Sequence, residues 1–267
     1  MIFITDLDKT FLRSDLSVSE YSVDIWNSFS YPLTIATARS YKGATTLLKN
    51  INLKYPLILL DGAMIANPDG NVIKINDIEK KTADELIDIV EKEFDERPLI
   101  VGFENIGDEK FLYPKKLNKY QKELLNNYKN DSRVLNIEHI RGLKHNLKLV
   151  YLGEKEKLAN IEKLIKKLFD LETKLSNDPY MDGYFLTILH PLGDKAHALK
   201  ILEEIMDVSK DEVTVFGDSL NDIGMFRYAK TSVAVKNALE EVKKEADIVL
   251  PHTNDEDGVA KYLSKFV

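Results

Sequence analysis

The sequence predicts an α/β fold with a doubly wound, mainly parallel sheet that is interrupted by a second, inserted α/β module. Short apolar runs alternate with helical patterns at both ends of the chain, whereas the apolar segments of the middle are longer and more alternating. The 267 residues also exceed one domain of about 150 residues. We therefore expect a split core, residues 1–80 and 191–267, and an insert over residues 81–190.

The core elements are predicted from short apolar runs bounded by polar residues. Strands are expected over residues 1–5, 32–36, 55–60, 213–216, 232–235 and 248–250. Helices are expected over residues 40–49, 195–206, 222–228 and 254–266, with Asp194 as the N-cap of the second. Strands that alternate with helices form parallel sheets, because a parallel connection needs a crossover segment.

The insert has helices and strands of its own. Thr82-Ala83-Asp84-Glu85 has the pattern of a capping box and predicts the start of a helix. Strands are expected over residues 99–103, 146–152 and 184–189, with an amphipathic helix over residues 155–169. The segment from Lys110 to Lys148 holds ten basic and three acidic residues, an excess of 10 − 3 = 7 positive charges. Either it attracts an anionic substrate or it is a solvated lysine-rich face, and both interpretations stay open.

The composition excludes several classes of protein. A hydrophobic fraction of 44% is too high for a disordered chain. The absence of cysteine excludes disulfides, thiolate metal sites and a cysteine nucleophile, and it fits a reducing compartment. The net charge of −7 argues against nucleic acid and anionic membranes as partners. No apolar stretch approaches the ~20 residues of a membrane span, and no signal peptide precedes Asp6, so we expect a cytoplasmic protein.

Two carboxylates stand directly after the first predicted strand. Asp6 and Asp8 are two residues apart, and like charges this close either raise one pKa or require a cation. Ligands of doubly wound sheets bind at the carboxyl ends of the strands, which is where this pair is expected. The alternative is a polar turn in which Asp8 acts as a cap.

A second acidic cluster, Gly217-Asp218-Ser219-Leu220-Asn221-Asp222, follows the strand predicted over residues 213–216. Gly217 permits a sharp turn or a close backbone approach. In a parallel sheet Asp218 would converge with Asp6 from the opposite end of the chain. Together with a main-chain carbonyl, these hard oxygen atoms suit Mg²⁺. The alternative is an ordinary turn and helix cap.

Two further elements have the character of anion sites. Thr37, Ala38 and Arg39 precede a predicted helix, where a hydroxyl and exposed N–H groups can bind an anion. Lys195 stands in the first turn of its predicted helix, where a cation opposes the helix dipole. An anionic ligand would explain that position, and the alternative is a solvated side chain.

In this order, the motifs resemble those of the haloacid dehalogenase-like phosphatases. The motifs are Asp6-Leu7-Asp8-Lys9-Thr10, Thr37, Lys195 and the segment from Gly217 to Asp222. With a cap-sized insert between Thr37 and Lys195, the chain looks most like the Cof-type subfamily, small sugar-phosphate phosphatases with a large α/β cap of type IIB. The resemblance covers essentially the whole chain. It implies a Rossmann-like core and a cap that selects the substrate.

The resemblance also implies a role for each acidic residue. Asp6 would attack phosphorus and form an aspartyl-phosphate, while Asp8 would act first as general acid and then as general base. Asp6, Asp218 and the main-chain carbonyl of Asp8 would coordinate Mg²⁺. Asp222 would support the metal from its outer shell.

The phosphate-binding residues implied by the resemblance come from three places in the sequence. They are Thr37, Ala38, Arg39, Lys195 and Asn221. The chain departs from the family pattern at Lys9, Ala38 and Ala196, where relatives usually have Gly, and at Asp61, where they usually have Asn. None of these departures removes a catalytic group, but Asp61 would add a carboxylate to the wall of the pocket.

The function implied is that of a Mg²⁺-dependent phosphatase of small phosphorylated metabolites, sugar phosphates first, working as a monomer or small homo-oligomer. Two related functions stay open: a phosphomutase, and a narrow phosphoglycoside phosphatase such as one for mannosyl-3-phosphoglycerate. A non-catalytic phospho-aspartate regulatory domain is disfavoured, because such domains are much shorter and lack the second Asp of the Asp6–Asp8 pair.

Overall fold

The computed structural model describes residues 1–177 and 183–267, which form two compact units. One unit comprises Met1–Lys74 and Asp194–Val267, and the other comprises Ile75–Gly193. The boundaries expected from the sequence lie 80 − 74 = 6 and 193 − 190 = 3 residues away. No helix of the described part of the chain is long and apolar enough to cross a bilayer.

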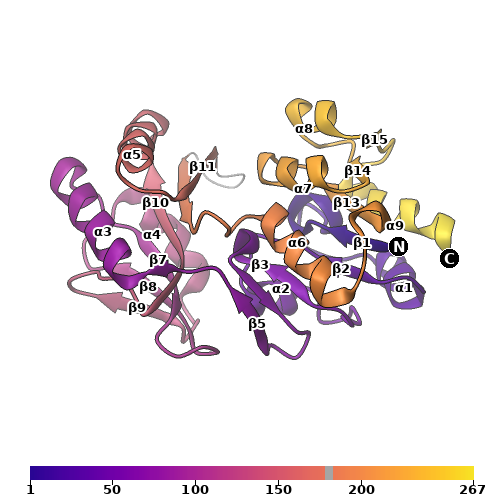
Figure 1. Cartoon of the computed structure of the whole chain (residues 1–267), viewed down its shortest axis with the longest axis horizontal. Coiled ribbons are helices and arrows are strands. Elements are labelled where there is room, and N and C mark those ends of the chain that lie inside the picture. Colours follow the sequence, from indigo (N-terminus) through magenta and orange to yellow (C-terminus); the bar gives the residue numbers. More distant parts are fainter. Residues whose placement is uncertain (178–182) are drawn as a thin grey trace. The chain divides into compact units, whose positions relative to one another are not determined.

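The first unit is built on a five-stranded sheet with the order β15-β14-β13-β1-β2 (Figure 1). Its strands are β1 (Ile2–Thr5), β2 (Leu33–Ile35), β13 (Val213–Gly217), β14 (Thr231–Ala234) and β15 (Ile248–Val249). All of their pairings are parallel. The strand order runs outward from β1 in both directions, so the predicted doubly wound sheet is confirmed.

Helices connect the strands of this sheet. They are α1 (Glu20–Ser28), α2 (Tyr41–Leu47), α6 (Lys195–Met206), α7 (Ile223–Tyr228), α8 (Glu240–Glu245) and α9 (Gly258–Leu263). A smaller sheet contains β3 (Leu57–Leu59), β4 (Met64–Ala66) and β5 (Val72–Ile75). A parallel bridge between Ala36 and Ile58 joins β3 to the end of β2.

Two elements of this unit differ from the sequence prediction. Helix α1 was not predicted: only Ser22 and Trp26 of its residues are buried, so its apolar periodicity is weak. Its N-cap is Ser19, whose hydroxyl accepts a hydrogen bond from the Ser22 N–H at 3.0 Å. The closing helix predicted over 254–266 is wrong in extent, because Asp257 takes a left-handed conformation with φ of 59° and interrupts it.

The second unit has a mainly antiparallel sheet with the order β11-β12-β10-β7-β8-β9, and β6 also pairs with β10. Only the β8–β9 pairing among those described is parallel. The strands are β6 (Ile78–Glu79), β7 (Leu99–Phe103), β8 (Glu109–Pro114), β9 (Val134–Ile137), β10 (His145–Gly153), β11 (Glu172–Asn177) and β12 (Tyr184–Leu189). The helices are α3 (Lys80–Phe94), α4 (Lys119–Leu125) and α5 (Lys155–Leu168).

The core of this unit lies between the two long helices and the sheet. The apolar faces of α3 and α5 are buried together with residues of β7, β10 and β12. The members from the helices are Ala83, Leu86, Ile87, Val90, Leu158, Ile161 and Ile165. Helix α5 therefore buries one apolar face, as predicted for an amphipathic helix over residues 155–169, although Leu168 at its end is exposed.

The capping box predicted at Thr82 is wrong. The N-cap of helix α3 is Glu79, three residues before Thr82, and it makes no side-chain cap hydrogen bond. Pairing of β6 with β10 brings the chain directly into the helix. Asp84 is used elsewhere, because its carboxylate accepts a hydrogen bond from the backbone N–H of Gly142 at 2.7 Å.

Many cations of the basic segment, Lys110 to Lys148, already have partners. At least six of its ten basic side chains form ion pairs with carboxylates of the same unit. Arg133, for example, contacts Glu109 and Asp131, both at 2.6 Å. These pairs favour the interpretation of the segment as a solvated, internally compensated surface.

Candidate active site

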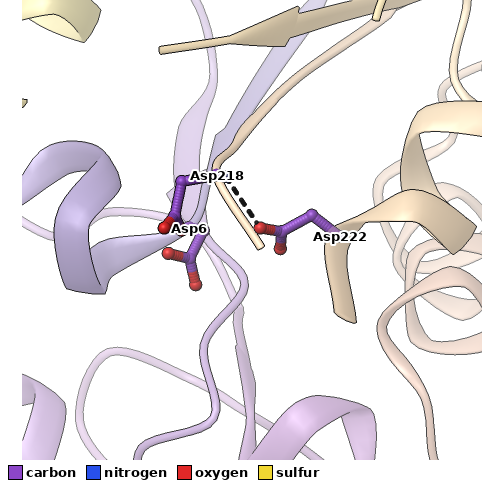
Figure 2. Close-up of side chains that lie close together, drawn as sticks. All are labelled: Asp6, Asp218 and Asp222. Atoms are coloured by element: carbon purple, nitrogen blue, oxygen red, sulfur yellow. Dashed lines mark hydrogen bonds between the residues drawn. The ribbon is translucent and has the colours of Figure 1, made fainter. Parts of the chain in front are cut away.

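The carboxyl ends of β1 and β13 bring Asp6 and Asp218 to the same edge of the parallel sheet. The strands are neighbours, and the backbone N–H of Asp6 donates to the carbonyl of Phe216 at 3.0 Å. Asp222 joins them from the turn before α7 (Figure 2). One oxygen from each of the three carboxylates lies within 4.8 Å of the other two, and all three side chains are buried.

Lys195 is the cation of this buried cluster. Its Nζ donates to Oδ1 of Asp6 and to Oδ1 of Asp222, both at 2.7 Å, and its side chain is fully buried. Asp194 acts as the predicted N-cap of α6 and accepts hydrogen bonds from two backbone N–H groups of the first turn. The turn at Gly62 packs against this helix start, because a Cβ there would lie 2.2 Å from the carbonyl oxygen of Asp194.

Three carboxylates and one ammonium give the cluster an excess of negative charge. Burial raises the pKa of Asp6 well above its ordinary value, and Lys195 offsets this only partly. Burial, followed by the nearby Asp222 carboxylate, raises the pKa of Asp218 to about 6. Burial by itself would lower the pKa of Lys195, but Asp222 and Asp6 outweigh it and raise that pKa. A buried cluster with this imbalance favours the approach of a cation.

Both oxygens of Asp222 have hydrogen-bond partners within the protein. Oδ1 accepts from Lys195, and Oδ2 accepts from the backbone N–H groups of Asp218 and Ser219, each at 3.0 Å. Gly217 makes this approach possible, since a Cβ there would lie 2.6 Å from the Asp222 carboxylate. Asp222 therefore orients its neighbours more than it offers ligand atoms.

Asp6 accepts one hydrogen bond and Asp218 two, against three at Asp222, so Asp6 and Asp218 keep more capacity for a hard divalent cation. Asp218 is held by the hydroxyls of Thr10 at 3.1 Å and Ser219 at 2.9 Å, so its orientation is fixed. Asp6 and Asp218 present buried carboxylate oxygens at the end of the sheet, which is the donor chemistry that Mg²⁺ prefers. The residues present thus fit the metal that the sequence analysis expects.

Asp8 lies in the turn after β1 and pairs with Arg39. The guanidinium donates from Nε to Oδ2 of Asp8 at 2.7 Å and from Nη2 to Oδ1 at 2.6 Å, a two-point contact. Both side chains are partly exposed. Lys9 makes the turn between Asp8 and Thr10 by adopting φ of 58°. Arg39 was predicted to bind phosphate, and in the structure its guanidinium contacts the expected acid–base residue.

The other two residues of the predicted phosphate loop differ in exposure. Thr37 is fully buried, and its hydroxyl accepts a hydrogen bond from the backbone N–H of Arg39 at 3.2 Å. Ala38 is exposed, and because its methyl side chain has no polar atom it can offer a ligand only its backbone. The loop is tied to the turn after β3, because the Asp61 N–H donates to the Thr37 carbonyl at 2.9 Å.

Asn221 contacts Asp61. Its Nδ2 donates to Oδ1 of Asp61 at 3.0 Å, and Asp61 is only 4% exposed. Sequence reasoning placed Asp61 near the pocket but did not pair these two residues, and it gave no part to the hydroxyls of Thr10 and Ser219. Both hydroxyl residues stand within the acidic motifs, since Thr10 is two residues after Asp8 and Ser219 follows Asp218. This proximity in the sequence is the feature that could have indicated their hydrogen bonds to the carboxylates.

Comparison with known sequences shows the family to which the chain belongs. A sequence profile of haloacid dehalogenase-like hydrolases matches residues 3–263. The chain is 26% identical over 278 residues to a Haemophilus influenzae protein named as a phosphatase, covering 98% of this chain and 96% of that protein. It is 23% identical over 269 residues to the 5-amino-6-(5-phospho-D-ribitylamino)uracil phosphatase of Bacillus subtilis, covering 98% and 95%.

Solved structures share the fold over the whole chain. A haloacid dehalogenase-like hydrolase from B. subtilis superposes with a TM-score of 0.81 at 24% identity, covering 100% of both chains. A Thermotoga maritima protein gives a TM-score of 0.77 at 26% identity, covering 100% of this chain and 97% of that one. The split α/β unit and its insert are therefore a recurrent arrangement.

Proposed function

The chain belongs to the haloacid dehalogenase-like hydrolases and is a phosphatase of that superfamily, and from this premise we propose that it hydrolyses small phosphorylated metabolites with Mg²⁺ through an aspartyl-phosphate. Sugar phosphates are the first substrates to consider. The observation that carries the proposal is the buried Asp6 held by Lys195 beside Asp218 at the end of the sheet. All the proposed catalytic residues lie in the unit of Met1–Lys74 and Asp194–Val267, so we assign catalysis to it and substrate selection to Ile75–Gly193.

Asp6 is the proposed nucleophile. One of its oxygens accepts the hydrogen bond from Lys195, which orients the carboxylate for attack through the other. Attack on phosphorus forms the aspartyl-phosphate while the bond to the leaving oxygen breaks. A carboxylate nucleophile splits the hydrolysis into two easier steps.

Asp8 is the proposed general acid and base. In its protonated form it gives a proton to the leaving alcohol. It then takes a proton from the water that attacks phosphorus in the second step, so inorganic phosphate leaves and Asp6 is regenerated. The two-point contact with Arg39 supports a positioning function for that guanidinium, which holds the Asp8 carboxylate in place between turnovers.

Lys195, Thr37, Asn221 and the backbone at Ala38 are the proposed partners of the phosphoryl oxygens. Phosphoryl transfer depends on positioning and on neutralising charge more than on covalent chemistry by the protein. Lys195 supports this proposal because its raised pKa keeps a full positive charge inside the site.

Asp6, Asp218 and the main-chain carbonyl of Asp8 are the proposed Mg²⁺ ligands. Asp222 supports them indirectly, since its oxygens are engaged by Lys195 and by backbone N–H groups. Bound Mg²⁺ would neutralise charge on the phosphoryl group and help to align it with the nucleophile.

The test is release of inorganic phosphate from p-nitrophenyl phosphate and from a panel of sugar, polyol and ribityl phosphates. We expect turnover with MgCl₂ and its loss with EDTA. Asp6→Asn keeps the shape of the side chain but removes the nucleophile, so phosphate release should fall by at least about 10³-fold with an unchanged circular dichroism spectrum. Absence of release across the panel, or wild-type rates in Asp6→Asn, would contradict the proposal.

A further inference from the structure

The turn after β3 is strained and held from two sides. Leu60 and Asp61 are consecutive residues with positive φ, 52° and 63°, a backbone conformation that L-residues seldom adopt. The Leu60 N–H donates to the Arg39 carbonyl, and the Asp61 N–H donates to the Thr37 carbonyl, both at 2.9 Å. The turn is thereby fixed against the loop that holds the proposed phosphate ligands.

This turn places a carboxylate where an apolar or amide side chain would be easier to bury. Asp61 is only 4% exposed, and its Oδ1 accepts from Nδ2 of Asn221 at 3.0 Å. A buried carboxylate is costly unless donors satisfy it. Asn221 is one such donor, and it lies next to Asp222, which binds Lys195.

The hydrogen bond between Asn221 and Asp61 has a fixed donor and a fixed acceptor. An ionised carboxylate can only accept hydrogen bonds, whereas an amide both donates and accepts. In the structure Asn221 turns its Nδ2, and not its Oδ1, toward Asp61. Its second Nδ2 hydrogen then remains for another acceptor, and a phosphoryl oxygen is an acceptor of the right kind.

We propose that Asp61 is a positioning residue that fixes the amide orientation of Asn221, so that Asn221 presents an N–H donor to a phosphoryl oxygen. This inference deepens the proposed function and rests on it for the location of the phosphoryl group. The Asp61 side chain touches neither substrate nor metal in this scheme, and it acts on the phosphoryl group through Asn221.

The test uses four variants and one probe, inorganic phosphate. Asp61→Gly removes the acceptor and suits the left-handed backbone, while Asp61→Asn keeps the size of the side chain but can donate as well as accept. Asn221→Ala removes the donor, and the double variant Asp61→Gly/Asn221→Ala closes a mutant cycle. Asp69→Gly is the matched control: it breaks a similar Asp–Asn contact, to Asn71 at 2.7 Å, on the exposed side of the same unit.

Phosphate affinity is measured by calorimetry in MgCl₂, with KM and kcat determined alongside. We expect Asp61→Gly and Asn221→Ala each to weaken phosphate binding about fivefold, the loss of one hydrogen bond. The double variant should be no weaker than Asn221→Ala, and Asp69→Gly should stay within about twofold of wild type. Asp61→Asn should weaken phosphate binding by about two- to fourfold, because an amide at this position lets Asn221 take either orientation. KM should rise by a similar factor, with a smaller change in kcat.

Several results would overturn the inference. It fails if Asp61→Gly binds phosphate like the wild type, if the two single losses add in the double variant, or if Asp61→Asn binds phosphate as tightly as the wild type. It also fails if the wild type does not bind phosphate. Failure of the proposed function looks different: the wild type would release no phosphate from any ester, whereas the mutant cycle in phosphate affinity would still report on Asp61.

Discussion

Two charged clusters join the N-terminal and C-terminal parts of the first unit, and they are built in opposite ways. In the site, one buried ammonium, Lys195, faces three buried carboxylates. In the other cluster Asp257 accepts hydrogen bonds from Arg13 at 2.9 Å and from Ser19 at 2.7 Å, close to the surface. The second cluster pairs its charges one to one, whereas the first has an excess of negative charge.

The pKa values of the two clusters shift in opposite directions. Burial raises the pKa of Asp257, but the hydrogen bonds from Arg13 and Ser19 outweigh it, so that pKa is lowered overall. Burial dominates at Asp6 and Asp218, and their pKa values are raised. In the Asp257 cluster the hydrogen bonds stabilise the charged carboxylate, so keeping it ionised in the folded protein costs little free energy. The site cluster holds carboxylates that gain from a cation, which is the condition for binding one.

The largest effect should come from Lys195→Met, which removes the ammonium and leaves Asp6 and Asp222 buried without it. We expect phosphate release to fall more than about 10³-fold and the free energy of unfolding to fall by about 3–5 kcal/mol at neutral pH without metal. Urea unfolding and phosphate release measure the two effects. The control is Lys49→Met, at an exposed position. A Lys195→Met protein as stable as the wild type would contradict the view that Lys195 stabilises the buried carboxylates of the site.

The second effect is a pH dependence of stability in EDTA. Because the pKa of Asp218 is about 6 in the folded protein and lower in the unfolded chain, its protonation favours folding. Lowering the pH from 7.5 to 5 should therefore raise the free energy of unfolding, by about 1.4 kcal/mol if Asp218 titrates alone. Asp218→Asn should remove most of this gain. A wild-type stability that is flat or falls over this range would show that burial does not dominate.

A smaller effect is expected for Asp257→Asn, which keeps the size of the side chain and suits the positive φ of 59°. Loss of the charged acceptor for Arg13 and Ser19 should lower the free energy of unfolding by about 1–2 kcal/mol. Because the pKa of Asp257 is lowered, its stabilising contribution persists above an ordinary Asp pKa and disappears as the pH falls through the lowered value. The ratio kcat/KM should change less than about twofold. A large loss of kcat/KM in a folded variant would link this cluster to the site.

The smallest effect on stability and activity is expected for a substitution in the basic segment, Lys110 to Lys148. Lys115 pairs with Glu138 at 2.8 Å, and both side chains are 67% exposed. Exposed pairs of this kind contribute little, so Lys115→Gln should shift the melting temperature by less than about 2 °C and leave KM unchanged for every substrate tested. A selective rise in KM for substrates with a second anionic group would instead support the substrate-attracting interpretation.

Only some of the contacts in the site can be predicted from the sequence. Asp6 and Asp218 follow apolar runs that form adjacent parallel strands, and the carboxyl ends of such strands share an edge. Their convergence therefore follows from local patterns and one topological rule. The Arg39–Asp8 and Asn221–Asp61 contacts join loops that do not follow one another in sequence, so no periodicity predicts them.

The sequence by itself determined the alternating elements of the first unit, the positions of its acidic residues at strand ends and the N-cap Asp194, because these depend on neighbours within a few residues. Only the tertiary structure decided where α3 begins, that α1 forms, and which partner each polar side chain takes. These outcomes depend on strand pairing and burial between distant segments. The pairing of β6 with β10 moves the start of α3 away from the predicted cap. The turn with positive φ at Asp61 brings its carboxylate within hydrogen-bond distance of Asn221. Local pattern fixes the elements and places the charges, while packing sets their orientation.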